Sequence, residues 1–225
     1  MGRRADQREA ESATLKRAGA EVKAPGLLIV VSGPSGVGKG SILAEAAGRL
    51  PNLVRSISVT TRPPRPNEAG GKDYFFRSQE QFDQMRQTGE FLEWARYLNN
   101  YYGTPRSWVV EKLQAGKDVA LEIDVQGGMQ VRESFPEAVL IFVTPPDRAG
   151  LELAAKAELR ARLMGRSTET AESVERRLSL YTKELEFLRH YDYEIVNERL
   201  EDAVDLFCAI VLAEKAKLSR KARDE

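Results

Sequence analysis

The segment best suited to chemistry is a short glycine-rich stretch, Gly33-Pro34-Ser35-Gly36-Val37-Gly38-Lys39-Gly40. In a loop of small residues, successive backbone N–H groups can point at phosphate oxygens, and a lysine at this place can bridge the terminal phosphates of a nucleotide. An apolar run typical of a buried strand precedes the stretch, and a segment typical of a helix follows it. In that context a glycine-rich turn without a ligand is a poor alternative. The sequence therefore predicts a P-loop that binds the phosphates of a nucleoside triphosphate.

One position departs from the strict P-loop pattern, which has Ser or Thr after the lysine to hold Mg²⁺. That place is taken by Gly40, and Ser41 follows one residue later. Either Ser41 serves as the metal ligand, or nucleotide phosphates and water hold the ion, which suits Mg²⁺. Ser41 is the candidate metal-ligating residue, and Mg²⁺ bound together with the nucleoside triphosphate is the expected cofactor.

A second candidate site contains two arginines, Arg62 and Arg65, in a stretch stiffened by Pro63 and Pro64. Two guanidinium groups suit a phosphate monoester dianion, which offers several oxygens to bidentate donors. Taken alone, a solvated basic turn would be an equally good interpretation of these residues.

Further motifs follow in a fixed order: Gly71-Lys72-Asp73-Tyr74-Phe75-Phe76, Phe91-Leu92-Glu93-Trp94-Ala95, Asn100-Tyr101-Tyr102-Gly103-Thr104 and Glu122-Ile123-Asp124-Val125-Gln126-Gly127. Together with the P-loop and the segment from Ser58 to Arg65, they closely resemble the guanylate kinase family over roughly residues 27–215. The resemblance implies a nucleoside monophosphate kinase that transfers the γ-phosphate of ATP to GMP, and also to dGMP, giving ADP and GDP. It implies direct in-line transfer within purine nucleotide metabolism.

The resemblance also implies roles for single residues. Glu93, helped by Asp124, is expected to accept from the N1–H and N2–H₂ edge of guanine, where adenine would be mispaired. Asp124 follows a predicted strand at the carboxyl edge of the sheet, so a role near Mg²⁺ stays open. The implied GMP-binding residues are Ser58, Arg62, Arg65, Tyr74, Glu93, Tyr102, Thr104 and Asp124.

A basic stretch later in the chain resembles the mobile lid of the family. Phosphoryl transfer needs positive charge around the γ-phosphate, and Arg166 and Arg177 match the lid arginines best. Ser167 stands where relatives often have Gly, and the segment 147–161 is longer than usual, so their effect on lid closure stays open. The implied catalytic residues are Lys39, Arg62, Arg166 and Arg177, and Asn197 is expected near the adenine of ATP.

The elements that must position these residues alternate between strands and helices. Strand-like runs are expected at 27–32, 54–60, 74–76, 91–97, 119–123, 139–143 and 193–196. Helices are expected at 41–50, 78–88, 105–114 and from Leu200 onward, and apolar residues at helical spacing predict one further helix over 174–188. This order predicts an α/β fold, a P-loop kinase with a central parallel sheet.

The expected domain organisation is a single guanylate-kinase-like domain over residues 26–217. Its core comprises 27–55, 105–146 and 178–217, with an inserted GMP-binding subdomain at 56–104 and a lid region at 147–177. Residues 1–25 are expected to be a flexible extension and 218–225 a polar tail, because both are rich in charged and small residues.

Composition restricts the possible partners. The chain has 34 basic and 34 acidic residues and thus no formal net charge, which argues against nucleic acid or an anionic membrane as the main partner. We find no apolar run long enough to span a bilayer and no signal-peptide pattern, so a cytoplasmic enzyme is expected. Oligomeric state is left open. The main alternative is a non-catalytic guanylate-kinase-like scaffold that binds phosphopeptides, but such domains have usually lost P-loop residues, and Gly33, Gly38 and Lys39 are present here.

Overall fold

Five parallel strands form the central sheet of the computed structural model, which describes residues 25–146, 152–164 and 171–221. Their order across the sheet is β2 (Leu53–Arg55), β7 (Asp118–Glu122), β1 (Leu28–Ser32), β8 (Val139–Thr144) and β9 (Tyr193–Val196). Strand β1 lies in the middle and pairs with β7 on one side and β8 on the other. The predicted α/β fold with a central parallel sheet is confirmed.

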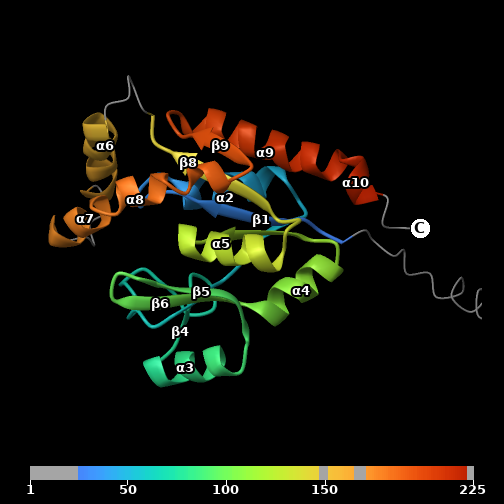
Figure 1. Ribbon diagram of the computed structural model, residues 1–225, viewed down its shortest axis with the longest axis horizontal. Helices are drawn as coiled ribbons and strands as arrows, with labels where there is room; N and C mark the ends of the chain where they lie inside the picture. Colours follow the sequence, from blue (N-terminus) through green and yellow to red (C-terminus); the bar gives the residue numbers. More distant parts are fainter. Residues whose placement is uncertain (1–24, 147–151, 165–170, 222–225) are drawn as a thin grey trace, which may run out of the picture.

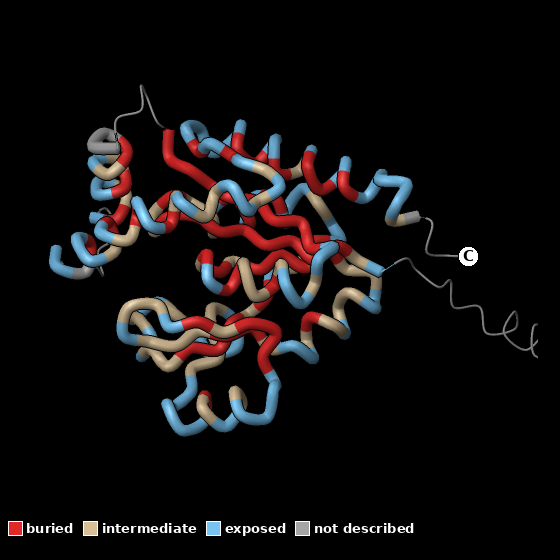
Figure 2. The backbone as a smooth tube through the Cα atoms, in the orientation of Figure 1, coloured by how far each residue is buried: buried red, intermediate tan, exposed pale blue. Residues whose placement is uncertain are grey.

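Side chains of the central strands alternate between two apolar layers, as the twofold period of a strand requires. Ile29 and Val31 belong to one layer, while Leu28 and Val30 belong to the other. Helices α2 (Lys39–Arg49) and α9 (Leu200–Ala216) cover the first face, and α4 (Arg106–Gln114) and α5 (Val125–Ser134) cover the second (Figure 1). The central strands β1, β7 and β8 are therefore buried on both faces (Figure 2).

A second, four-stranded sheet lies beyond α5, with the order β4 (Phe75–Phe76), β3 (Val59–Thr60), β6 (Asn100–Pro105) and β5 (Phe91–Tyr97). Helix α3 (Gln79–Gln87) packs on it through Phe82, whose ring stacks on Phe91 with centroids 4.5 Å apart. A capping box between Ser78 and Gln81 starts this helix. The sheet has its own apolar core and falls within the segment expected to be inserted.

The strand expected over 54–60 is wrong as one element, because it divides between the two sheets. Its first part is β2, which pairs with β7, and its last part is β3, which pairs with β4 and β6. Between them Ser56 still donates to the carbonyl of Ala120 at 2.9 Å, and the carbonyl of Ser58 accepts from Phe75 at 2.9 Å. An extended chain that leaves one sheet for another keeps its alternation, so periodicity alone cannot show the division.

The single helix expected over 174–188 is also wrong. The chain forms α7 (Ala171–Leu178), α8 (Tyr181–Leu185) and a short 3₁₀ turn at Leu188–His190. The break falls at Ser179, whose hydroxyl donates to the carbonyl of Arg176 at 2.8 Å, and the N–H of Leu180 bonds three residues back to Arg177 at 3.2 Å. Such local bonds end a helix while its apolar stripe continues, so Val174, Leu178 and Tyr181 still enter one core.

The remaining helices are α6 (Glu152–Met164), which packs against α7, and α10 (Leu218–Lys221) after α9. Among the described residues, no helix is long and apolar enough to cross a membrane. The expected extension up to residue 24, Arg166, Ser167 and residues 222–225 lie outside the described residues.

Candidate active site

A cavity of about 430 Å³ opens where the carboxyl ends of β1 and β7 face the second sheet. Ligands of open α/β sheets bind at this edge. The cavity is lined by most of the residues predicted from the sequence, namely Gly33, Ser35, Gly36, Gly38, Lys39, Gly40, Ser41, Ser58, Arg62, Arg65, Tyr74, Glu93, Tyr102, Asp124 and Arg177. Segments far apart in the chain thus meet at one site.

The loop from Gly33 to Gly38 has the backbone that its glycines predict. Gly36 and Gly38 have φ values of 88° and 100°, in the left-handed region that favours glycine. The ammonium group of Lys39 donates to the carbonyls of Gly33 at 2.6 Å and Pro34 at 3.2 Å. The loop therefore forms a nest at the start of α2, with the lysine folded against its own backbone.

Asn197 supports this loop from behind. It is buried, and its amide Nδ2 donates to the carbonyl of Val37 at 2.7 Å. Arg162 donates to the same carbonyl at 3.3 Å and to the carbonyl of Asn197 at 2.9 Å. Asn197, Val37, Pro34 and Thr104 are predicted site residues that do not line the cavity.

Glu93 lies at the other end of the cavity, buried on β5. Its Oε1 accepts from the hydroxyl of Thr104 at 2.6 Å, and a Cβ built on Gly127 would lie 2.4 Å from its Oε2. Burial raises the pKa of Glu93 to about 7, since the hydrogen bond from Thr104 only partly offsets it and the charge of Asp124 adds to it. Thr104 thus acts by holding Glu93.

Asp124 has a structural contact as well as a place in the cavity. Its Oδ1 accepts from the N–H of Gly127 at 2.9 Å and caps the start of α5. Burial raises the pKa of Asp124, while backbone hydrogen bonds and the charge of Lys39 lower it. One carboxylate oxygen of Asp124 therefore caps the helix, and the charge of Asp124 interacts with Lys39 and with Glu93.

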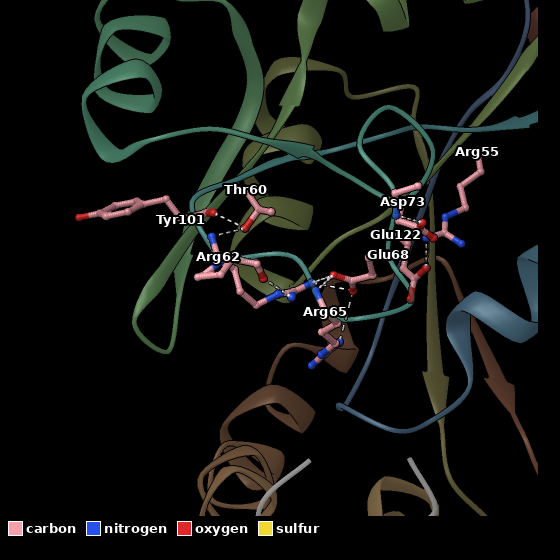
Figure 3. A network of polar contacts seen from close by, with 10 residues as sticks. Arg55, Thr60, Arg62, Arg65, Glu68, Asp73, Tyr101 and Glu122 are labelled. Atoms are coloured by element: carbon pink, nitrogen blue, oxygen red, sulfur yellow. Dashed lines mark hydrogen bonds and ion pairs between the residues drawn. The ribbon is translucent and has the colours of Figure 1, made fainter. Parts of the chain in front are cut away.

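The arginine pocket, defined here as Ser58, Arg62, Arg65, Tyr74 and Tyr102, forms the side of the cavity on the second sheet. The guanidinium of Arg62 lies 5.4 Å from the centroid of the Tyr74 ring, and that ring lies 6.0 Å from the ring of Tyr102. Figure 3 shows Arg62 and Arg65 converging on the carboxylate of Glu68. Positive charge and phenol groups in this arrangement can bind a phosphate.

Arg177 reaches the cavity from α7. Its Nη1 donates to the hydroxyl of Ser35 at 3.0 Å, and Ser35 also hydrogen-bonds Tyr97 of β5. Burial raises the pKa of Tyr97, as does the nearby charge of Glu184. The Ser35 hydroxyl thus joins the P-loop, the second sheet and the helix that carries Arg177.

Several lining residues were not predicted as site residues, namely Arg55, Glu68, Asp73, Ala95, Tyr97, Glu122, Ile123 and Glu184. Glu184 is buried, and burial raises its pKa to about 7. The charge of Lys39 acts to lower this pKa, and the charge of Asp124 acts to raise it. The sequence carries one signal for a role of Glu184: it lies three residues after Tyr181 on the apolar stripe, and charged residues are rarely buried unless they are paired. Arg55 carried no comparable signal in the sequence.

The fold and the cavity define a class: an α/β P-loop protein whose nucleotide-phosphate loop faces a second, arginine-containing anion pocket. Comparison with known proteins specifies it. The family model described as guanylate kinase matches residues 26–214, so this chain belongs to the guanylate kinase family.

Relatives of this family match most of the chain. It is 48% identical over 198 residues to a guanylate kinase of Halalkalibacterium halodurans, covering 88% of this chain and 93% of that protein. It is 49% identical over 197 residues to a guanylate kinase of Listeria monocytogenes, covering 87% and 92%. A crystal structure of guanylate kinase from Anaplasma phagocytophilum matches with a TM-score of 0.71 at 34% identity, covering 88% of this chain and 90% of that one.

Proposed function

We propose that this chain is an ATP:GMP phosphotransferase, which transfers the γ-phosphate of ATP to GMP, and also to dGMP, giving ADP and GDP. The observation that carries this proposal is that one cavity is lined by the P-loop with Lys39, by the buried acceptor Glu93 and by Arg62. Membership of the guanylate kinase family supports the same substrates.

The residues divide into a donor set and an acceptor set. The P-loop amides and Lys39 bind the ATP phosphates, and Glu93, held by Thr104, reads the donor edge of guanine. The arginine pocket holds the GMP phosphate, and Arg177 adds positive charge near the transferred group. Because the attacking group is already an anionic phosphate oxygen, alignment and charge stabilisation carry most of the catalysis.

Arg166 belongs to the same proposal by its place in the sequence, as the second arginine that closes over the ATP phosphates. The amide Nδ2 of Asn197 holds the P-loop by donating to the carbonyl of Val37. The proposed contact of Asn197 with adenine would use the other hydrogen-bonding groups of the same amide. We also propose that the GMP-binding subdomain comprises residues 56–104 and that the lid region comprises residues 147–177.

The residues present fit a Mg²⁺ ion that arrives with ATP. Ser41 lines the cavity, and the carboxylate of Glu122 lies beside Gly40, where an added Cβ would be 3.2 Å from Oε2. In the described part of the chain, no group of three or more His, Cys, Asp and Glu residues could hold a metal by itself. This suits Mg²⁺, which binds through one or two protein oxygens together with phosphates and water and neutralises phosphate charge.

The test is a coupled assay of diphosphate formation with ATP and each of GMP, dGMP, AMP, UMP and CMP. We expect turnover with GMP and dGMP and at least ~100-fold lower kcat/KM with the others, because a mispaired buried polar group discriminates strongly. Turnover with AMP or a pyrimidine nucleotide at a similar kcat/KM would refute the assignment. Absence of turnover together with binding of a phosphopeptide would favour the scaffold alternative. We propose the cytoplasm, where ATP and GMP are available, as the place of the reaction.

A further inference from the structure

Glu68 lies among the phosphate-binding arginines, where a negative charge would be expected to oppose binding. Its Oε1 and Oε2 accept from Nη2 of Arg62 at 2.7 and 2.8 Å, and Nη1 of Arg65 lies 3.6 Å from Oε1. The side chains of Arg62 and Glu68 are each only 15% exposed. The carboxylate therefore sits between two cations that come from the same short loop.

The same carboxylate is held by the backbone of its own turn. The N–H of Glu68 donates to the carbonyl of Arg65 at 3.0 Å, which closes a four-residue turn. In return the N–H of Arg65 donates to Oε2 of Glu68 at 2.9 Å. To leave the arginines, the carboxylate would have to give up a backbone hydrogen bond inside this turn.

The electrostatics agree with a fixed ion pair. Burial acts to raise the pKa of Glu68, but hydrogen bonds from Arg62 and from the backbone of Arg65 outweigh it, so the pKa is held below its ordinary value. Burial acts to lower the pKa of Arg62, but the hydrogen bond to Glu68, the charge of Glu68 and the neighbouring Tyr102 outweigh it, so the pKa is raised. Both groups are charged together at neutral pH.

Two roles are compatible with a carboxylate in this place, and they predict opposite effects. A resident anion that competes with the incoming phosphate would have to move away on binding. A strut that fixes the arginines would stay and hold their guanidinium groups in place while the ligand binds. The hydrogen bond from the turn to Oε2 favours the strut, because it anchors the carboxylate independently of either guanidinium.

We propose that Glu68 is a positioning residue of the arginine pocket, which holds Arg62 and Arg65 in the geometry that receives the phosphate of the acceptor nucleotide. The inference rests on the proposed function, since it concerns the GMP phosphate. Arginine has many rotamers, and two guanidinium groups this close repel each other, so a fixed carboxylate between them lowers the entropy lost when a phosphate binds.

The test is calorimetric titration of the full chain with GMP and, separately, with ATP. We expect Glu68→Gln, which keeps the shape and loses the charge, to raise the Kd for GMP by ~10-fold or more while the Kd for ATP stays within ~twofold. Glu111→Gln serves as the matched control, because Glu111 is an exposed residue of α4 outside the cavity, paired with Lys112. If wild type does not bind GMP, the proposed function fails before this inference is reached.

A double-mutant cycle then separates a positioning role from a general structural one. Glu68 binds Arg62 through both oxygens and has the longer, 3.6 Å contact with the guanidinium of Arg65, so most of its effect should pass through Arg62. The Kd for GMP of Arg62→Lys combined with Glu68→Gln should therefore exceed that of Arg62→Lys alone by less than ~threefold. Tighter GMP binding in Glu68→Gln would instead identify a competing anion and overturn the inference. Equal losses for GMP and ATP, or fully additive losses in the cycle, would also overturn it.

Discussion

Replacing Glu93 by glutamine should raise the free energy of unfolding of the protein and lower its kcat/KM for GMP. Glu93 is buried, and its pKa is raised to about 7 from an ordinary 4.5, chiefly by burial. In the ligand-free protein the neutral form therefore predominates below about pH 7. Guanine presents two N–H donors and is expected to require the ionised form. Glutamine keeps the shape and can still accept from Thr104, but it presents an amide N–H₂ to the base.

The effect on stability depends on pH in a defined direction. Since the folded pKa lies above the unfolded one, the stability linked to the neutral acid is present below the unfolded value of 4.5 and is lost as the pH rises to about 7. At about 1.4 kcal/mol per unit, this shift corresponds to about 3 kcal/mol of unfolding free energy lost by wild type at higher pH. We expect Glu93→Gln to recover ~1–3 kcal/mol at about pH 8, because burying the amide offsets part of the gain.

The effect on GMP has the opposite sign. The variant loses one charge-assisted hydrogen bond and places its own amide donor against an N–H donor of guanine. This should weaken the transition-state complex by ~1–3 kcal/mol, so kcat/KM for GMP falls by ~5–150-fold near pH 8. The ratio of wild-type to variant kcat/KM should rise as the pH increases through about 7, since only wild type gains its acceptor there. The ratio cancels titration of the GMP phosphate itself.

Two measurements check this reasoning: urea unfolding of the ligand-free proteins at about pH 5 and 8, and kcat/KM over the same range. Glu111→Gln, an exposed substitution of the same kind, should change neither quantity by more than ~0.5 kcal/mol. A kcat/KM for GMP within threefold of wild type would show that Glu93 does not read guanine. A variant less stable than wild type at both pH values would show that the lost contacts of Glu93 outweigh the cost of burying its charge.

Three further substitutions test other parts of the site. Lys39→Ala should lower kcat by ~10³-fold or more and leave GMP binding by calorimetry unchanged, because Lys39 serves only the donor phosphates; loss of GMP binding would contradict that division. Arg177→Ala should lower kcat by ~10²-fold or more with KM for GMP within ~fivefold, since it acts once both substrates are bound; steady-state kinetics showing unchanged kcat and raised KM would make it a binding residue instead. Gly127→Ala should raise KM for GMP by ~10-fold while the protein still folds. The added Cβ would lie 2.4 Å from Oε2 of Glu93 and would displace that carboxylate. Gly48→Ala is the control and should leave KM unchanged, because a Cβ on Gly48 would have nothing within 4 Å.

The parts of the fold that the sequence predicted well are those with a single clear period. The strands β1, β8 and β9 are short apolar or alternating runs bounded by turn residues, and their observed bounds differ little from the expected ones. Helix α5 was not predicted, because Gly127 and Gly128 within it lower helix propensity. Packing explains why these two positions are glycines. A Cβ on Gly127 would lie 2.4 Å from Oε2 of Glu93, and a Cβ on Gly128 would lie 2.3 Å from the hydroxyl of Tyr191. Tertiary contacts therefore overrule helix propensity there.

The candidate site was predictable where a residue lies inside a motif and was missed where tertiary structure brings it in. The P-loop and the residues around Glu93 are contiguous stretches, and their order carries the information. Glu184 and Tyr97 reach the cavity from α8 and β5 only because the chain breaks at Ser179 and because the second sheet folds over the P-loop. No local pattern encodes that approach.

The contacts of Lys39 and Arg62 in the ligand-free site lead us to expect different responses to a bound phosphate. Lys39 is satisfied by the neutral carbonyls of Gly33 and Pro34, which a phosphate oxygen can replace with a stronger, charge-assisted bond. Arg62 is satisfied by a carboxylate that its own loop anchors, and replacing one anion by another gains little. We therefore expect binding to draw Lys39 toward the donor phosphates, while Arg62 stays paired with Glu68. On this proposal the donor side of the site reorganises on binding, and the acceptor side is formed beforehand.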